Sequence, residues 1–191
     1  PPREGYLQGL RRLCDEYGVV LIFDEVKTGF RAALGGYQSV CGVRPDLTVL
    51  GKAVANGYPL GVIGGRREIM SLFCEENPAR RVMIAGTYNA HPVSVFAGIA
   101  TVRALMRDGG AVYRELERKT ARLVAGLEEV MAEAGVTCTI SRVGSAFCAY
   151  FMDHVPVDWH DLAQHHDSAF DAAYRRALIE EGIYHFPLPT K

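Results

Sequence analysis

The stretch from Val19 to Val26 constrains this chain more than any other, because five apolar residues lead directly into two carboxylates. A continuous apolar run rich in β-branched residues predicts a strand that is buried on both faces, as in parallel sheets. Ligands bind beyond the carboxyl ends of the strands in open α/β sheets, so Asp24 and Glu25 lie where chemistry is expected. The sequence therefore predicts an α/β protein with a ligand site at this edge of the sheet.

A second short apolar run, residues 47–50, is followed by Gly51 and Lys52. A lysine is a useful nucleophile only where burial or neighbouring groups keep part of it neutral, and the small neighbours of Lys52 predict an apolar approach. Such a lysine suits a Schiff base with an aldehyde cofactor. A carboxylate such as Asp24 would keep a pyridine nitrogen protonated, so that the ring acts as an electron sink. The pair indicates a pyridoxal-phosphate enzyme, although Lys52 taken alone also fits a surface lysine after a strand.

Apolar periodicity predicts the other elements. Helices are expected over 4–17, 37–41, 67–74, 93–106, 112–134 and 168–181, and strands over 60–65, 136–142, 146–152 and 183–186. The two strands after residue 135 flank Val143-Gly144-Ser145 and predict a hairpin, and with it a small α+β domain at the C-terminal end. The chain begins at Pro1 without Met and stops just after the last predicted strand, so we expect it to be truncated at both ends.

The composition excludes several classes of function. A formal net charge of −1 over 191 residues predicts no binding of nucleic acid or anionic membrane. No apolar run approaches the roughly 18–20 residues of a transmembrane helix. The five cysteines are odd in number and show no C-x-x-C spacing, which predicts reduced thiols in the cytoplasm.

Five short motifs follow one another between residues 24 and 65. They are Asp-Glu-Val at 24–26, Thr-Gly-Phe-Arg at 28–31, Leu-Gly-Lys at 50–52, Asn-Gly-Tyr-Pro-Leu-Gly at 56–61 and Ile-Gly-Gly at 63–65. In order and spacing, over about residues 4–110, they resemble the signature of class III aminotransferases, which are pyridoxal-phosphate enzymes of fold type I. Arg142-Val143-Gly144-Ser145 followed by Phe147 resembles the glutamate-1-semialdehyde 2,1-aminomutase branch of that family.

The resemblance implies a role for each matching residue. Lys52 would form the Schiff base and move a proton on the substrate, Asp24 would pair with the pyridine nitrogen, and Val26 would pack against the ring. Gly86 and Thr87 resemble the segment that reaches the cofactor phosphate of the neighbouring subunit, which implies a homodimer. A hydroxyl and backbone N–H groups before a helix are suitable phosphate donors.

The reaction implied is transfer of an amino group from a small amine or amino acid to a carbonyl acceptor. In an aminomutase the amine moves within one molecule, and the residues leave transfer and isomerisation both open. The resemblance also implies that residues 1–125 are the C-terminal part of the large cofactor-binding domain, and 126–191 part of the small domain. The glycine- and serine-rich phosphate loop and the ring-stacking aromatic residue of the family are expected before residue 1.

Three other interpretations compete with this one. Residues 19–25 resemble a Walker B strand, but no G-x-x-x-x-G-K-[ST] motif occurs, since Asp46 stands where a glycine is needed and Ala53 follows the lysine. A catalytically inactive, dimerising fragment of the same fold is the second.

Glu25 has a separate expectation, which is a structural hydrogen bond to a nearby loop.

The third alternative is a metal site in a segment rich in histidine and aspartate. The residues concerned are His154, His160, His165, His166, Asp153, Asp158, Asp161 and Asp167. Their spacing fits no closed zinc pattern, and adjacent His165 and His166 point to different faces of a regular element. The sequence therefore predicts a solvated polar loop and no metal.

Overall fold

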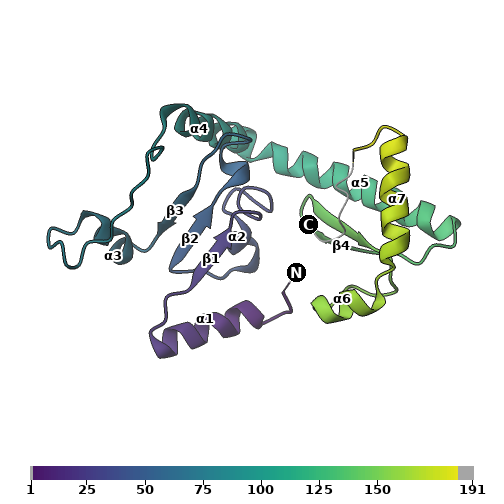
Figure 1. Ribbon diagram of the computed structural model, residues 1–191, viewed down its shortest axis with the longest axis horizontal. Coiled ribbons are helices and arrows are strands. Elements are labelled where there is room, and N and C mark those ends of the chain that lie inside the picture. Colours follow the sequence, from purple (N-terminus) through teal and green to yellow (C-terminus); the bar gives the residue numbers. More distant parts are fainter. Residues whose placement is uncertain (1, 185–191) are drawn as a thin grey trace. The chain divides into compact units, whose positions relative to one another are not determined.

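The computed structural model describes residues 2–184, which form two compact units, 2–116 and 117–184 (Figure 1). The units divide within the long helix α5 (Ala111–Glu133), and the boundary expected at 125/126 falls further along the same helix.

A three-stranded mixed sheet forms the centre of the first unit (Figure 1). Its strands are β1 (Ile22–Glu25), β2 (Leu47–Leu50) and β3 (Val62–Gly65), in that order across the sheet. β1 and β2 are parallel, and β2 and β3 are antiparallel. All three strands were predicted, and the sheet belongs to an α/β fold.

The helices of this unit follow the chain order that the sequence predicted. They are α1 (Tyr6–Tyr17), α2 (Tyr37–Cys41), α3 (Arg67–Met70) and α4 (Pro92–Met106), with short 3₁₀ turns η1 (Lys52–Val54), η2 (Ser71–Cys74) and η3 (Arg107–Gly109). α1 ends at Gly18, whose positive φ of 63° lets its N–H bond back to the carbonyl of Cys14. Cys14 packs with Leu21 and Val43 in the core of this unit, so the apolar face of α1 covers the start of β1.

The prediction that the first strand is buried on both faces was wrong. Leu21 is buried, but Val19, Val20 and Ile22 are each about half exposed. Within residues 2–184, β1 has a hydrogen-bonded neighbour on one side only, which is β2. The described residues therefore supply no second neighbouring strand that would help to cover both faces of β1.

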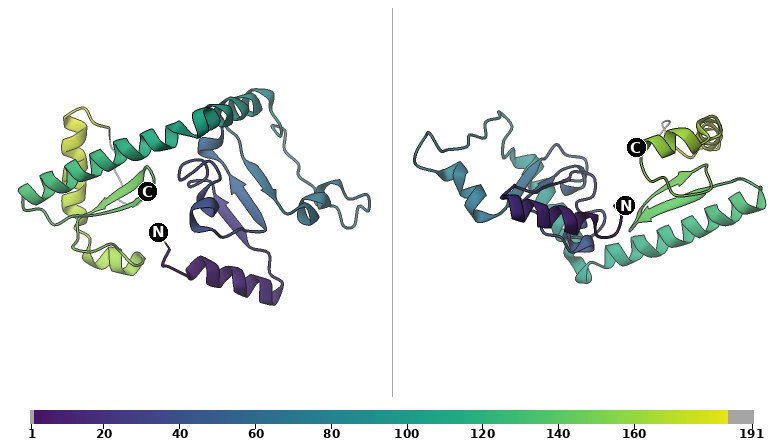
Figure 2. Two further views of the ribbon diagram at one scale, coloured as in Figure 1. Left: turned by 180° about the vertical axis from the view of Figure 1, so that it is seen from behind. Right: turned by 90° about the horizontal axis from the view of Figure 1, so that it is seen from below.

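The second unit contains the predicted hairpin, β4 (Thr139–Val143) and β5 (Ala146–Tyr150), which Figure 2 shows from two further directions. Two helices follow, α6 (Trp159–His165) and α7 (Ser168–Glu180). Phe151 after β5 packs edge-on against the rings of Phe170 and Tyr174 of α7, with ring centroids 4.8 and 5.3 Å apart. This aromatic contact holds α7 against the end of the hairpin.

The end of the described chain differs from the prediction. Ile183 and Tyr184 lie in no regular element, and the rest of the strand expected over 183–186 lies outside the described residues. Among residues 2–184, no helix combines the length and the apolar character needed to cross a membrane.

Candidate active site

The parallel pairing of β1 and β2 brings the two predicted catalytic residues to one edge of the sheet. The register places Asp24 opposite Val49 and Glu25 opposite Leu50. Lys52 follows two residues after the end of β2, so it lies at the edge where β1 also ends. Parallel strands end at a common edge, and this is where open α/β sheets bind ligands.

Lys52 has an unusual backbone conformation. Its φ is +45°, in the left-handed region that residues with a side chain rarely adopt. Such strain persists only where the surrounding structure enforces it, and it is concentrated at functional sites. Lys52 is exposed, in contrast to the apolar approach predicted for it, and lines a depression of about 590 Å³ together with Arg31, Asn56 and Tyr58.

Val26 and Gly51 are in contact between the two strand ends. A Cβ atom placed on Gly51 would lie 3.2 Å from Cγ1 of Val26, so the absence of a side chain at Gly51 lets Val26 pack over the backbone that precedes Lys52. Asp24 is exposed, and its Oδ1 accepts a hydrogen bond of 3.0 Å from the N–H of Val26. Asp24, Val26 and Lys52 therefore belong to one local arrangement.

Glu25 is a structural residue, as the sequence predicted. It is 2% exposed, and its carboxylate accepts hydrogen bonds from the hydroxyl of Thr28 and from the backbone N–H groups of Tyr37 and Gln38. These bonds hold the loop after β1 against the sheet. Because Arg31 belongs to that loop, Glu25 also positions one wall of the depression beside Lys52.

Gly86 and Thr87 lie in a long exposed segment. Every residue from 76 to 93 is exposed, and the segment carries Met83 and Tyr88, which are 81% and 80% exposed. Its turn at Gly86 is closed by hydrogen bonding from the N–H of Asn89 to the carbonyl of Gly86, 3.1 Å. Tyr88 and His91 line a second depression with Tyr58 and Pro59. Tyr58 and Pro59 also line the depression at Lys52, so the two depressions are adjacent.

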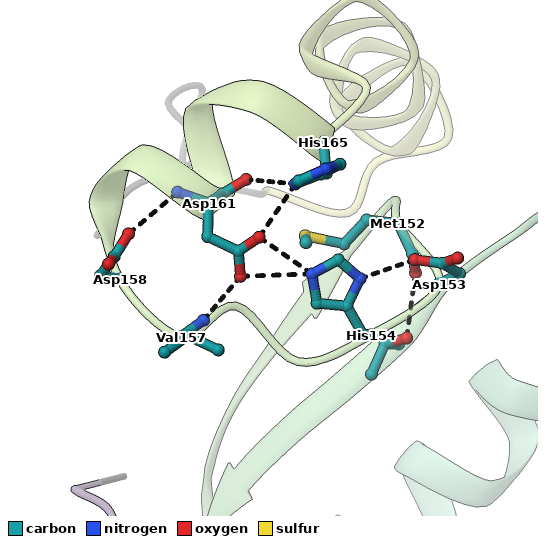
Figure 3. A network of polar contacts seen from close by, with 8 residues as sticks. Met152, Asp153, His154, Val157, Asp158, Asp161 and His165 are labelled. Carbon is teal, nitrogen blue, oxygen red and sulfur yellow. Dashed lines mark hydrogen bonds and ion pairs between the residues drawn. The ribbon is translucent and has the colours of Figure 1, made fainter.

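The histidine-rich segment is largely exposed to solvent as predicted, but it is not a loop throughout, because residues 159–165 form α6. His154, Asp161 and His165 form a network of polar contacts with Asp153, Val157 and Asp158 (Figure 3). Sequence reasoning missed this because it missed α6. Asp158 is the N-cap of that helix and accepts a hydrogen bond from the N–H of Asp161, a D-x-x-D signal that could have located the helix start.

His166 belongs to a different, buried network. Its Nδ1 accepts a hydrogen bond of 3.1 Å from the N–H of Phe151, and its Nε2 lies 3.3 Å from Oδ2 of Asp171. The other carboxylate oxygen of Asp171 accepts from Nε of Arg175 at 2.6 Å. These contacts join β5 to α7 and assign His166 a structural role.

Comparison with known proteins places the chain in one family. Residues 1–186 match the sequence model described as aminotransferase class-III. The chain is 46% identical over 187 residues to proteins named glutamate-1-semialdehyde 2,1-aminomutase from Citrifermentans bemidjiense and from Geotalea daltonii. In each case 98% of this chain is covered and 42% of the relative, so the chain spans less than half the length of these curated relatives.

Solved structures agree with this result. An ω-transaminase from Sphaerobacter thermophilus has a TM-score of 0.88 at 38% identity, covering 99% of this chain and 42% of that one. A glutamate-1-semialdehyde aminomutase from Pseudomonas aeruginosa PAO1, in complex with PMP, has a TM-score of 0.83 at 26% identity, covering 98% and 42%. Fold and sequence therefore show that this chain belongs to the class III aminotransferase family and has its fold type I architecture.

Proposed function

We propose that this protein transfers an amino group between an amine or amino acid and a carbonyl acceptor, with pyridoxal 5'-phosphate as its cofactor. The observation that carries the proposal is the shared edge of β1 and β2, where Asp24, Val26 and Lys52 come together. When bound, the cofactor supplies an electron sink for a carbanion at the substrate.

The residues at this edge fit such a cofactor. The side chain of Val26 on Gly51 offers an apolar surface to a flat ring. The carboxylate of Asp24 accepts a hydrogen bond from the N–H of Val26 and is exposed, so it can also accept one from a protonated ring nitrogen. The amine of Lys52 opens to the depression that Arg31 and Tyr58 also line.

Each residue then has a defined task. Lys52 holds the cofactor through its amine and, when released, carries a proton to or from the substrate carbon. Asp24 keeps a proton on the ring nitrogen, because an ion pair in a closed site favours the charged form. Val26 excludes water from one face of the ring.

The exposed segment around Thr87 supports a homodimer. Met83 and Tyr88 of this segment are 81% and 80% exposed in the single chain, and Phe96 of the following helix α4 is 70% exposed. Exposed apolar surface of this kind is typical of protein interfaces. We propose that a second copy covers it, and that Gly86 and Thr87 bind the cofactor phosphate of that copy.

A second candidate function is the aminomutase reaction, in which the amine moves within one substrate. It is favoured by the 44–46% identity to relatives named glutamate-1-semialdehyde 2,1-aminomutase. The two candidates differ in their need for a partner substrate. An aminomutase converts its substrate alone, whereas a transaminase needs an amino donor and a carbonyl acceptor together.

The domain assignment and the compartment are also proposals. We assign residues 1–125 to the large cofactor-binding domain and 126–191 to the small one. The five cysteines are free thiols, which fits a reducing cytoplasm.

The test uses the protein expressed from its own gene, incubated with pyridoxal phosphate and reduced with borohydride. The chain holds Lys27, Lys52, Lys119 and Lys191, so three lysines serve as internal controls. Label confined to Lys52, and lost in Lys52→Arg, is the expected result. Label spread evenly over the lysines, or a protein that binds no cofactor, would leave the inactive dimerising fragment as the better interpretation.

A further inference from the structure

The second unit contains three side chains of ligand type that meet outside the candidate active site (Figure 3). Nε2 of His154 lies 3.0 and 3.2 Å from the two carboxylate oxygens of Asp161. Nδ1 of His165 lies 2.9 Å from Oδ1 of the same carboxylate. One atom from each of the three residues can be chosen so that all lie within 4.8 Å of one another.

We propose that His154, Asp161 and His165 bind a divalent first-row transition cation, with Zn²⁺ as the reference ion. Two imidazole nitrogens and one carboxylate oxygen form the ligand set of open zinc sites, in which water takes the fourth position. Bonds of about 2.0–2.2 Å at tetrahedral angles place neighbouring ligand atoms roughly 3.3–3.5 Å apart. The N···O separations of 3.0 and 2.9 Å are close to that value, and the ligand atoms of all three residues lie within 4.8 Å of one another, so side-chain rotations bring them around one ion.

The central carboxylate is held in place by the start of α6. Oδ2 of Asp161 accepts a hydrogen bond of 2.8 Å from the N–H of Val157. The backbone N–H of Asp161 donates to Oδ1 of Asp158 at 2.9 Å. Asp161 and His165 are four residues apart on α6, so their side chains share one helix face. Two of the three ligands are therefore positioned by a single capped helix.

The third ligand is oriented by a further carboxylate. Nδ1 of His154 lies 2.6 Å from Oδ1 of Asp153, while Nε2 of the same ring faces Asp161 (Figure 3). Metal-binding histidines commonly donate their second ring N–H to a carboxylate, which fixes the ring and raises its basicity. Asp153 supplies that outer contact here.

Exposure and ligand type decide which ion fits. The side chains of His154 and His165 are 41% and 45% exposed, and that of Asp161 is 18% exposed, so a hydrated ion reaches the cluster from solvent. Ca²⁺ and Mg²⁺ prefer oxygen ligands and suit two imidazoles poorly. Imidazole nitrogens must be free of protons to bind the cation, so its affinity should fall as pH is lowered.

The experiment titrates Co²⁺, as a spectroscopic probe for zinc sites, into the protein expressed from its own gene. The expected result is one Co²⁺ per chain with visible d–d bands, no thiolate charge-transfer band, and displacement by Zn²⁺ but not by Mg²⁺. His154→Gln and His165→Gln should each weaken binding more than Asp153→Asn, for which a loss of about 10- to 100-fold is expected. His160→Gln is the matched control on the same helix and should leave the affinity unchanged.

Two results would overturn the proposal. The first is the absence of binding or equal affinity in the parent chain and all the variants. The second is a thiolate charge-transfer band that assigns the ion to the cysteines. Asp153 and His165 are exposed, so their variants are expected to fold, which circular dichroism checks. If His154→Gln fails to fold, the comparison of His165→Gln with His160→Gln still decides the question.

Discussion

Gly36 lies directly against the carboxylate of Glu25, so that a Cβ atom at Gly36 would stand 2.6 Å from Oε2. The same carboxylate accepts backbone hydrogen bonds from Tyr37 and Gln38, the residues that follow Gly36. The end of β1 therefore fixes the path of the loop that leads to α2. That loop carries Arg31 to the depression beside Lys52, so a buried acid with no chemical role shapes the site.

Gly36→Ala is expected to destabilise the chain. Gly36 has φ 73° and ψ −172°, a backbone region that is almost restricted to glycine, and strain there costs about 1–3 kcal/mol before any clash with Glu25. Gly42→Ala is the control, because Gly42 has φ 69° and ψ 13° with nothing within 4 Å of an added Cβ. Urea unfolding should show the larger loss for Gly36→Ala. Equal losses would mean that the Glu25 contact is unimportant.

Asp46 joins three elements of the first unit. Its Oδ2 accepts hydrogen bonds of 2.8 Å from the N–H of Leu21 and from Nη1 of Arg11, and its Oδ1 accepts one of 3.1 Å from Arg66. The hydrogen bond from Leu21, followed by that from Arg11, lowers the pKa of Asp46 to about 2. The carboxylate therefore stabilises the folded state in its charged form.

The stability contributed by Asp46 should depend on pH in the acid range. Because the folded pKa is depressed, the contribution is complete above the unfolded value of about 4 and is lost as pH falls toward 2. Asp46→Asn should lower the free energy of unfolding by about 2 kcal/mol at pH 7, and the difference from the parent chain should shrink below pH 4.

Asp15→Asn is the control for this experiment. Asp15 pairs with the same Arg11 at 2.7 Å, but its side chain is 67% exposed. Exposed pairs four residues apart on a helix contribute about 0.3–0.5 kcal/mol. If Asp15→Asn lowered the free energy of unfolding as much as Asp46→Asn, burial of Asp46 would not explain its larger expected contribution.

Asp24→Asn should reduce turnover while the cofactor still binds. An opposite charge within a few ångströms raises the pKa of the ring nitrogen by about 1–3. Removing that charge should lower the protonated fraction of the ring, and with it the rate, by about 10- to 1,000-fold. Steady-state kinetics and the visible spectrum of the natural-length protein measure the two effects separately. Full activity in Asp24→Asn would remove this residue from the role.

Thr87→Ala should weaken cofactor binding rather than chemistry. A hydrogen bond to a charged group contributes about 1.5–3 kcal/mol, which corresponds to roughly 10- to 150-fold in the dissociation constant of pyridoxal phosphate. Thr137→Ala, at an exposed threonine of the second unit, is the matched control. If both variants bind the cofactor as the parent does, the phosphate is held elsewhere.

The sequence predicted the elements well where one local pattern decides them. The apolar period of α1, the apolar runs of β1 to β3 and the alternation of the hairpin were all confirmed within a few residues. The first strand was expected to begin too early, because Val19 and Val20 are apolar but pair with no strand among residues 2–184. The ladder starts at Ile22, which pairs with Leu47 just after Asp46 turns the chain.

Burial and contacts between side chains were harder to predict, because they depend on residues that are distant in sequence. The contact of Val26 with Gly51, and that of His154 with α6, arise from strand pairing and from a helix of seven residues. The small neighbours of Lys52 did not predict its exposure, because the residues that cover or leave open a strand end are distant from it in the sequence. Glu25 was assigned correctly because a buried acid needs hydrogen-bond donors, and a nearby loop supplies them.

The exposed segment from residue 76 to 93 has a genetic consequence. If Thr87 serves the site of the other copy while Lys52 serves its own, a mixed dimer of a Lys52 variant and a Thr87 variant contains one site with both residues intact. Two individually defective alleles would then restore activity when expressed together. Two alleles that both alter the edge of β1 and β2 would not complement each other.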